Sequence, residues 1–309
     1  MEQRVLNTNP LLEAFGNAKT LRNDNSSRFG KFIKIQFANE GQILGATIEK
    51  YLLEKTRVIH QTSGERNYHI FYQLIKGSSP ELLEKVKLSR DISQYQYLLN
   101  DKDVSFIPNV KDEDEFVRTS KCMESIGIQG DSQKDLLSLI SGILHLGNVN
   151  FGDDDVDGQV TGLDTTTGDS NAGLTHAAEM VGVQASELLT CLTQQNMHVS
   201  GATIIKMQSK AQAVDKRNSV AKSIYAMIFN WLVGKINSTI SPSKEAWGYI
   251  GLLDIYGFEN FDNLNSFEQL LINYANEKLQ SHFNKVCHGA SHFNKVCHGA
   301  RCQLYAFAI

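Results

Sequence analysis

Two short stretches far apart in the sequence carry the side chains best suited to chemistry. The first stretch, residues 23–31, reads Asn-Asp-Asn-Ser-Ser-Arg-Phe-Gly-Lys and so combines amides, hydroxyls and a guanidinium. These groups can bind phosphate. Asn, Asp and Ser also favour polar turns, because their side chains hydrogen-bond to the nearby backbone. Residue types alone therefore leave two interpretations open, a phosphate-binding loop and a plain turn before a strand.

The second stretch, residues 252–259, favours the phosphate interpretation. It reads Leu-Leu-Asp-Ile-Tyr-Gly-Phe-Glu, and its Asp254 lies near the end of an apolar run over residues 249–255. A nearly continuous apolar run predicts a strand that is buried on both faces in a mostly parallel sheet. Ligands of such sheets bind at the carboxyl ends of the strands. We therefore expect Asp254 to lie at a ligand site.

Regular elements flank both stretches and must position them. Residues 9–16, with proline at the first helical position and a final glycine, predict a short helix before the first stretch. Alternating residues after it predict strands at 33–37 and 43–48 that are joined by a short turn. A capping box begins a predicted helix over residues 266–279. We expect a hairpin to hold the first stretch and a helix to follow the second.

Most of the chain between the two stretches is predicted to be helical. Apolar periodicity predicts helices at 65–75, from Ser79-Pro80 onward, and at 112–126, 135–146 and 214–236. The fourth of these is apolar nearly all round, so we expect it to be deeply buried, with His145 in the core. His69 is also predicted to pack rather than to catalyse, because no Ser, Cys or Asp lies beside it in the sequence.

Two irregular segments interrupt the predicted helices. Residues 151–173 are acidic and rich in turn formers, which predicts a surface loop. Alternate aspartates from Asp153 onward suggest a calcium loop, but its twelfth position is Asp164 where the motif requires Glu, so a solvated loop is favoured. Residues 199–209 form a polar-flanked segment that we expect at the surface as a partner-binding element.

Composition limits the class of protein. The chain has 309 residues, of which 41% are hydrophobic, so it is long enough for about two domains with a real core. The net charge of -4 provides no basic field for nucleic acid. Five cysteines are too few for a disulfide framework and favour a reducing, cytoplasmic setting. No apolar window is long enough for a transmembrane segment, and a soluble protein is expected.

Taken together, the two stretches resemble switch I and switch II of the myosin motor domain. The resemblance covers about residues 5–284 and includes further myosin-like segments at 6–20, 65–72, 142–149 and 265–279. Kinesins share Ser-Ser-Arg in switch I, but they continue with Ser-His and carry Gly-Ser-Glu in switch II. Phe-Gly-Lys at 29–31 and Gly-Phe-Glu at 257–259 favour the myosin family.

The resemblance implies an α/β fold, a P-loop NTPase-like motor fragment with a central, mostly parallel sheet and a largely helical upper actin-binding subdomain. Residues 1–280 would form a partial motor domain. Its implied parts are switch I at 23–31, the upper actin-binding subdomain at about 40–245, switch II at 254–259 and the start of the relay helix at 266–280. Residues 281–309 would be an aberrant tail, in which residues 281–290 are repeated unchanged as 291–300. A zinc site is disfavoured there, because the tail has no paired C-x-x-C spacing.

The resemblance also implies roles that fit phosphoryl transfer, in which a protein mainly positions groups and neutralises charge. ATP and Mg²⁺ are the implied cofactors. The implied contacts to the nucleotide or its metal are Asn23, Asn25, Ser27 and Asp254, with Ser27 on the Mg²⁺ and Asp254 on it through water. The implied catalytic group is Ser26 on the attacking water, the Gly257 amide on the γ-phosphate, and an Arg28–Glu259 ion pair that closes the site.

The sequence departs from the family pattern at two points, and the first of them limits the expected ATPase activity. The sequence contains no G-x-x-x-x-G-K-[ST] phosphate loop, since Gly30-Lys31 and Gly234-Lys235 both lack the rest of the motif. We therefore expect a middle fragment of an actin-based motor, without its converter, that does not turn over ATP alone. The alternatives are a non-enzymatic actin-binding relic and a non-functional truncated product.

The implied partners are the actin filament, the rest of the motor and its light chains, in the cytoskeleton. Actin would contact the loop at about 199–209. At the position where the family carries an acidic or phosphorylatable residue, counted back from Asn218, this chain has Ala202. Ala202 offers neither a charge nor a phosphate acceptor, so the usual tuning of actin affinity is not expected at this position.

Overall fold

The protein was analysed as a computed structural model, which describes residues 6, 8–153, 155–160, 162–164, 166, 169–199, 202–242, 244–255, 257–260, 265, 267–288 and 304–307. The chain divides into two units. We call residues 1–9, 26–54 and 233–309 the sheet unit, and residues 10–25 and 55–232 the helical unit. No helix in the described part of the chain is long and apolar enough to cross a membrane.

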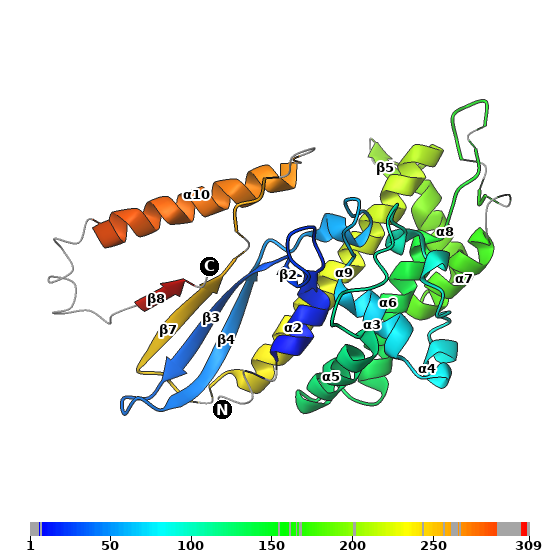
Figure 1. Cartoon of the computed structure of the whole chain (residues 1–309). Coiled ribbons are helices and arrows are strands. Elements are labelled where there is room, and N and C mark those ends of the chain that lie inside the picture. Colours follow the sequence, from blue (N-terminus) through cyan, green and yellow to red (C-terminus); the bar gives the residue numbers. More distant parts are fainter. Residues whose placement is uncertain are drawn as a thin grey trace. The chain divides into compact units, whose positions relative to one another are not determined.

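The sheet unit is built on a four-stranded sheet (Figure 1). Its strands are β3 (Gly30–Phe37), β4 (Ile43–Tyr51), β7 (Gly248–Asp254) and β8 (Leu304–Phe307), in the order β4-β3-β7-β8. A turn joins β3 to β4, and Gly41 adopts a φ of 81° there, which glycine tolerates without strain. The predicted hairpin is therefore confirmed. The short strand β2 (Ser26–Ser27) precedes β3, and helix α10 (Phe267–His288) follows β7.

The expectation of a mostly parallel sheet is wrong for the described strands. Strand β3 pairs antiparallel with both β4 and β7, and β7 pairs parallel with β8. An apolar run does not encode strand direction, and the tight β3–β4 turn permits only an antiparallel pair. Strand β7 is also not buried on both faces, since Ile250 is 40% exposed. The fold is a mixture of helices and sheets in which the antiparallel pairs dominate.

The end of helix α9 (Lys210–Ile240) packs tightly on strand β4 within the sheet unit. The Asn237 side chain accepts a hydrogen bond from the Ile48 amide and donates one to the Ile48 carbonyl, each at 2.8 Å. A Cβ atom on Gly45 would lie 2.5 Å from the carbonyl oxygen of Ile240. The second observation places backbone against backbone, where no flexible side chain can yield.

The helical unit contains most of the α-helices. Their bounds are α2 (Asn9–Gly16, from Pro10 onward in this unit), α3 (His69–Gly77), α4 (Pro80–Lys85), α5 (Asp112–Ser125), α6 (Asp131–Gly147), α7 (Ser170–Val181), α8 (Ala185–Thr193) and α9 up to Leu232. Shorter elements are β1 (Asn17–Ala18) and the 3-10 turns η1 (Lys55–Val58), η2 (Ile92–Gln94) and η3 (Gln96–Leu98). The predicted helices are thus present, but α3 begins four residues later than expected.

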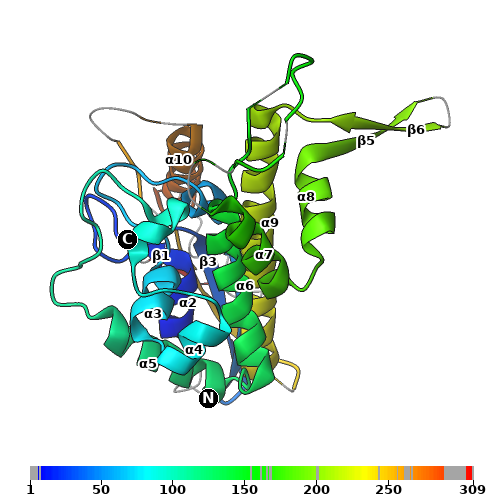
Figure 2. The same ribbon diagram turned by 90° about the vertical axis from the view of Figure 1, so that its right-hand side faces the viewer.

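A hairpin replaces the partner-binding loop expected at residues 199–209. Strands β5 (Gln194–Val199) and β6 (Ala202–Met207) pair antiparallel, with Gln194 opposite Met207. Figure 2 shows this hairpin projecting beyond the ends of α8 and α9. The short sequence offers little periodicity, so backbone pairing rather than an apolar pattern defines this element.

The core of the helical unit combines apolar packing with buried ion pairs. Tyr225 is fully buried, its ring stacks 4.8 Å from that of Tyr68, and its hydroxyl donates to the Phe15 carbonyl at 2.7 Å. The Arg66 guanidinium is fully buried and donates to both carboxylate oxygens of Asp112 at 2.9 and 3.0 Å. The late start of α3 has a backbone cause, because the Arg66 amide donates to the Lys19 carbonyl at 2.9 Å and Tyr68 forms an antiparallel bridge with Ala18.

Helix α6 is deeply buried, as its apolar pattern predicts. Its buried side chains include Leu136, Leu137, Ile140, Ile143, Leu144 and Leu146. His145 lies among them, which confirms the prediction that it belongs to the core. Burial, with a smaller effect of His176, lowers the pKa of His145 to about 4, so the ring is neutral at neutral pH.

We predict that Gly45→Ala destabilises the protein by about 1–3 kcal/mol, because the added methyl must displace backbone atoms of α9. Gly248→Ala is the matched control, since a Cβ there meets no atom within 4 Å and the change should stay within about 0.5 kcal/mol. The free energy of unfolding in urea measures both. Equal effects of the two substitutions would contradict the tight packing of α9 on β4.

Candidate functional site

Arg28 is the centre of the candidate site in the sheet unit. Its side chain is only 1% exposed, and the residue lies in the sequence between strands β2 and β3. Nε donates to Glu54 Oε2 at 2.7 Å, and Nη1 donates to Glu259 Oε1 at 2.7 Å. Nη2 reaches the other Glu259 oxygen at 3.4 Å, and Nη1 also donates to Ser26 Oγ at 3.2 Å. The guanidinium therefore ties together three segments of the sheet unit.

The electrostatics of this cluster favour a permanently charged Arg28. Burial opposes the charge, but the carboxylates of Glu54 and Glu259 outweigh it and raise the pKa of the guanidinium above its usual value. A buried cation of this kind must be paired, since an unpaired charge in the interior is costly. Glu54 and Glu259 share the one guanidinium of Arg28, so these three side chains together carry one more negative charge than positive charge.

Glu259 is held from the other side by helix α10. The Glu259 amide donates to Asn273 Oδ1 at 2.7 Å, and Asn273 Nδ2 donates to the Glu259 carbonyl at 2.6 Å. Gln269 Nε2 donates to Glu259 Oε2 at 3.3 Å. Positions 269 and 273 are one helical turn apart and share a face of α10. The segment that carries Glu259 is thus joined to both Arg28 and α10.

Asp254 and Ser27, the implied metal ligands, have partners of their own in the structure. Lys31 Nζ lies 2.5 Å from Asp254 Oδ2, and the two residues are opposite each other in the β3–β7 register. Ser27 Oγ donates to the Phe29 carbonyl at 2.9 Å. No described interaction joins Asp254 to Ser27, and no cluster of three metal-ligating side chains occurs among the described residues.

These two oxygen donors nevertheless fit Mg²⁺ that is bound together with a phosphate ligand. Mg²⁺ takes oxygen ligands and usually keeps only one or two protein groups beside waters and phosphates. The Ser27 hydroxyl donates its proton to Phe29 and so keeps its oxygen lone pairs available. Asp254 would have to share its carboxylate with Lys31.

Gly257 has open space where a side chain would be. The residue is exposed, and a Cβ atom built on it meets no described atom within 4 Å. The backbone around its amide is therefore accessible to a group that approaches closely. Its neighbour at 256 lies outside the described residues, as does Ser266 of the predicted capping box.

Asn23 and Asn25 belong to the helical unit, where the loop that carries them is built by local hydrogen bonds. Asn23 is linked to Thr20 by hydrogen bonds in both directions, at 2.8 and 3.1 Å. Asn23 Oδ1 accepts from the Asn25 amide at 2.8 Å. The Asn25 side chain is in turn bonded to Glu13 and Asn17. This arrangement leaves the Asn23 Nδ2 group without a hydrogen bond to any described residue.

Sequence reasoning missed Glu54, Gln269 and Asn273. The pairing of β3 with β4 could have indicated Glu54. Gly30 pairs with Tyr51, so continuing both segments past the end of the hairpin brings position 28 near position 54. The Glu54 amide donates to the Arg28 carbonyl at 3.0 Å, one residue out of step with the register in which Gly30 faces Tyr51. The helical spacing of 269 and 273 was a weaker signal, because it shows a common face but not its partner.

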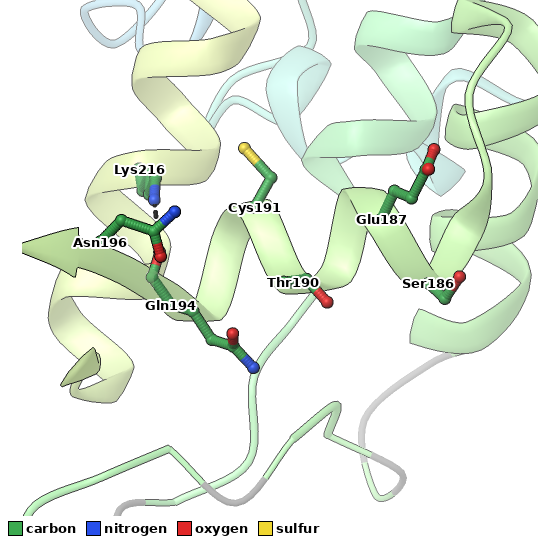
Figure 3. Close-up of a pocket in the computed structure, with 7 residues that line it drawn as sticks. All are labelled: Ser186, Glu187, Thr190, Cys191, Gln194, Asn196 and Lys216. Carbon is green, nitrogen blue, oxygen red and sulfur yellow. Dashed lines mark hydrogen bonds between the residues drawn. The ribbon is translucent and has the colours of Figure 1, made fainter. Parts of the chain in front are cut away.

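A separate pocket of about 480 Å³ lies in the helical unit beside α8 (Figure 3). It is lined by Ser186, Glu187, Thr190, Cys191, Gln194, Asn196 and Lys216. Lys216 Nζ donates to the Gln194 carbonyl at 2.7 Å and so fixes the base of the β5–β6 hairpin. None of the residues implied for ATP chemistry lines this pocket.

Comparison with known proteins places these features in a family. The profile of the myosin head (motor domain) matches residues 1–290. The chain is 46% identical over 286 residues to Myosin-3 of Arabidopsis thaliana and 46% identical over 285 residues to the Myosin-I heavy chain of Dictyostelium discoideum. It is 42% identical over 290 residues to unconventional myosin-Ic of Rattus norvegicus. Each match covers 92% of this chain.

The chain therefore belongs to the myosin motor domain family, as its two stretches predict. It spans 24%, 12% and 27% of the length of these three relatives, respectively. The roles of the individual site residues in ATP chemistry stay predictions, although the structure brings Arg28 and Glu259 together.

We predict that Glu54→Gln lowers the free energy of unfolding by about 1–3 kcal/mol, because Arg28 loses one of its two charged partners inside the protein. Glu49→Gln is the control. It breaks the more exposed Lys34–Glu49 pair between strands β3 and β4, and we expect a cost of about 0–1 kcal/mol. Denaturant unfolding distinguishes the two, and a cost for Glu49→Gln at or above that for Glu54→Gln would contradict the assigned role of Glu54.

Proposed function

We propose that this chain forms the switch region of an actin-based motor that couples MgATP hydrolysis to force on filaments. The observation that carries the proposal is the buried ion pair between Arg28 and Glu259, which are 231 positions apart in the chain. A guanidinium–carboxylate pair between two loops can close a site, exclude water and align a reacting group. Membership of the myosin head family supports this use of the pair.

The site residues then have distinct roles. The free Nδ2 group of Asn23 donates to phosphate oxygens, and Asn25 holds the loop that presents it. Ser26, which accepts from Arg28, positions the attacking water. Mg²⁺, bound by Ser27 and through water by Asp254, neutralises phosphate charge.

The open backbone at Gly257 serves the γ-phosphate. Its amide can approach a phosphate oxygen without hindrance from a side chain, since no described atom fills that space. Movement of this segment carries Glu259 with it, and the Asn273 side chain passes that movement to α10. We assign switch I to residues 23–31, switch II to 254–259 and the start of the relay helix to 266–280.

The remaining assignments follow from the family. Residues 1–280 form a partial motor domain of the P-loop NTPase type, with the upper actin-binding subdomain at about 40–245. The segment at about 199–209, which includes strand β6 of the projecting β5–β6 hairpin, is the element that contacts actin, in the cytoplasm and on the cytoskeleton. The rest of the motor and its light chains are the other partners. Residues 281–309 form the tail, of which Leu304–Phe307 pair with β7 as strand β8.

The chain on its own should bind MgATP without turning it over. The 309 residues contain no G-x-x-x-x-G-K-[ST] motif, which cradles the phosphates in P-loop NTPases. Hydrolysis then needs a phosphate loop from outside these residues. The alternative function is non-enzymatic actin binding, and pelleting with filaments that ignores ATP would favour it.

We predict that millimolar MgATP shifts the side-chain amide resonances of Asn23 and Asn25 in the 309-residue chain, while phosphate release stays at the buffer rate. Asp254→Asn should abolish the difference between ATP with Mg²⁺ and ATP with a chelator, because a carboxylate that helps hold the metal is lost. Asp24→Asn is the control. Asp24 lies on the loop of Asn23 and Asn25 but pairs with Lys19 at the surface, so this substitution should preserve that difference. Hydrolysis at a motor-like rate, or no response to MgATP, would contradict the proposal.

A further inference from the structure

His69 is a buried histidine that the expected site does not include. It is the first residue of helix α3 and is 9% exposed, so the prediction that it packs in the interior holds. However, its Nε2 atom lies 3.1 Å from Asn25 Oδ1, a contact within the helical unit. Packing alone does not require this polar contact.

The direction of the hydrogen bond follows from the groups around Asn25. Asn25 Nδ2 faces Glu13 Oε2 at 3.2 Å, and a carboxylate can only accept there, so the amide nitrogen must point toward Glu13. Asn25 Oδ1 consequently faces Asn17 Nδ2 at 3.1 Å and His69 Nε2 at 3.1 Å. An amide oxygen only accepts, so His69 carries its proton on Nε2.

Three partners therefore hold one amide in one orientation. The restraint extends to Asn23, because the Asn25 backbone amide donates to Asn23 Oδ1 at 2.8 Å. That bond occupies the Asn23 oxygen and leaves its Nδ2 group as the free donor of the loop. A loop that is already ordered binds more tightly, since less conformational entropy is lost on binding.

The charge state of His69 is compatible with a constant role. Burial has the largest effect and, together with Arg66 and Arg57, lowers the pKa of His69 to about 3 against the opposing effect of Asp112. The ring is then neutral at neutral pH. With one nitrogen protonated, it presents a single donor to Asn25.

We propose that His69 is a positioning residue whose Nε2–H fixes the Asn25 amide and presets the loop at residues 23–25 for the phosphates of a nucleotide. This inference rests on the proposed function. Its structural part, the His69–Asn25 clamp, concerns the nucleotide-free chain and can be tested without any ligand.

Two substitutions distinguish positioning from packing. The side-chain nitrogen of Gln overlays histidine Nε2, whereas that of Asn overlays Nδ1 and does not reach Asn25. With asparagine-selective ¹⁵N labelling of the 309-residue chain, we expect slow side-chain amide exchange at Asn25 in wild type and His69→Gln. In His69→Asn we expect exchange about fivefold faster, which corresponds to one lost hydrogen bond. Equal exchange in all three proteins would overturn the inference.

The nucleotide arm uses MgATP as the probe. His69→Asn should bind about fivefold more weakly than wild type, and His69→Gln should bind within about twofold. Equal affinities with a released Asn25 amide would overturn the positioning role. If wild type does not respond to MgATP, the proposed function fails, and the role of the His69–Asn25 clamp in nucleotide binding fails with it. The exchange data still decide whether the clamp itself exists. If His69→Asn does not fold, the wild-type imidazole ¹⁵N spectrum decides, since a proton on Nδ1 would overturn the clamp.

Discussion

The constraint on which the sheet unit depends is the burial of a single positive charge. The Arg28 side chain is almost completely inaccessible, so its guanidinium needs charged partners in the interior. The carboxylates of Glu54 and Glu259 are such partners, and Ser26 is a neutral acceptor beside them. Those partners come from the end of the β4 segment and from the segment after β7. The sheet brings them within reach because β3 lies between β4 and β7. Removing either carboxylate leaves the buried Arg28 charge with one charged partner in place of two, so its burial is less well compensated.

The helical unit also contains buried ion pairs, here near the loop at residues 23–25. Buried Arg66 pairs with Asp112, and Arg57 pairs with Glu65 at 2.9 Å. Burial, together with the charges of Arg66 and Arg57, lowers the pKa of His69 and keeps its ring neutral, so that it offers one donor to Asn25. Each unit thus holds one loop of the proposed site by polar contacts as well as by apolar packing. Such contacts contribute little net stability, but they make alternative arrangements costly, since an unpaired buried group has no compensation.

Local patterns predicted local structure, and long-range contacts decided the rest. The β3–β4 hairpin and helix α6 follow from alternation and periodicity, which each segment contains in full. The direction of β7 and the late start of α3 depend on contacts with distant residues, and the β5–β6 hairpin depends on backbone pairing between neighbouring segments with little apolar pattern. For the site, the resemblance identified Arg28 and Glu259, while Glu54 and the His69 contact required the register and the burial of the folded chain.

The central claim is that Arg28 and Glu259 act as one energetic unit. A double-mutant cycle with Arg28→Met and Glu259→Gln, measured as the free energy of unfolding of the 309-residue chain, tests it most directly. The structure predicts a coupling energy of at least about 1.5 kcal/mol, because Arg28→Met removes the cation that pairs with Glu259, and Glu259→Gln leaves the buried Arg28 with Glu54 as its remaining carboxylate partner. Additive effects within about 0.5 kcal/mol would mean that the two side chains do not interact in solution and would contradict the account.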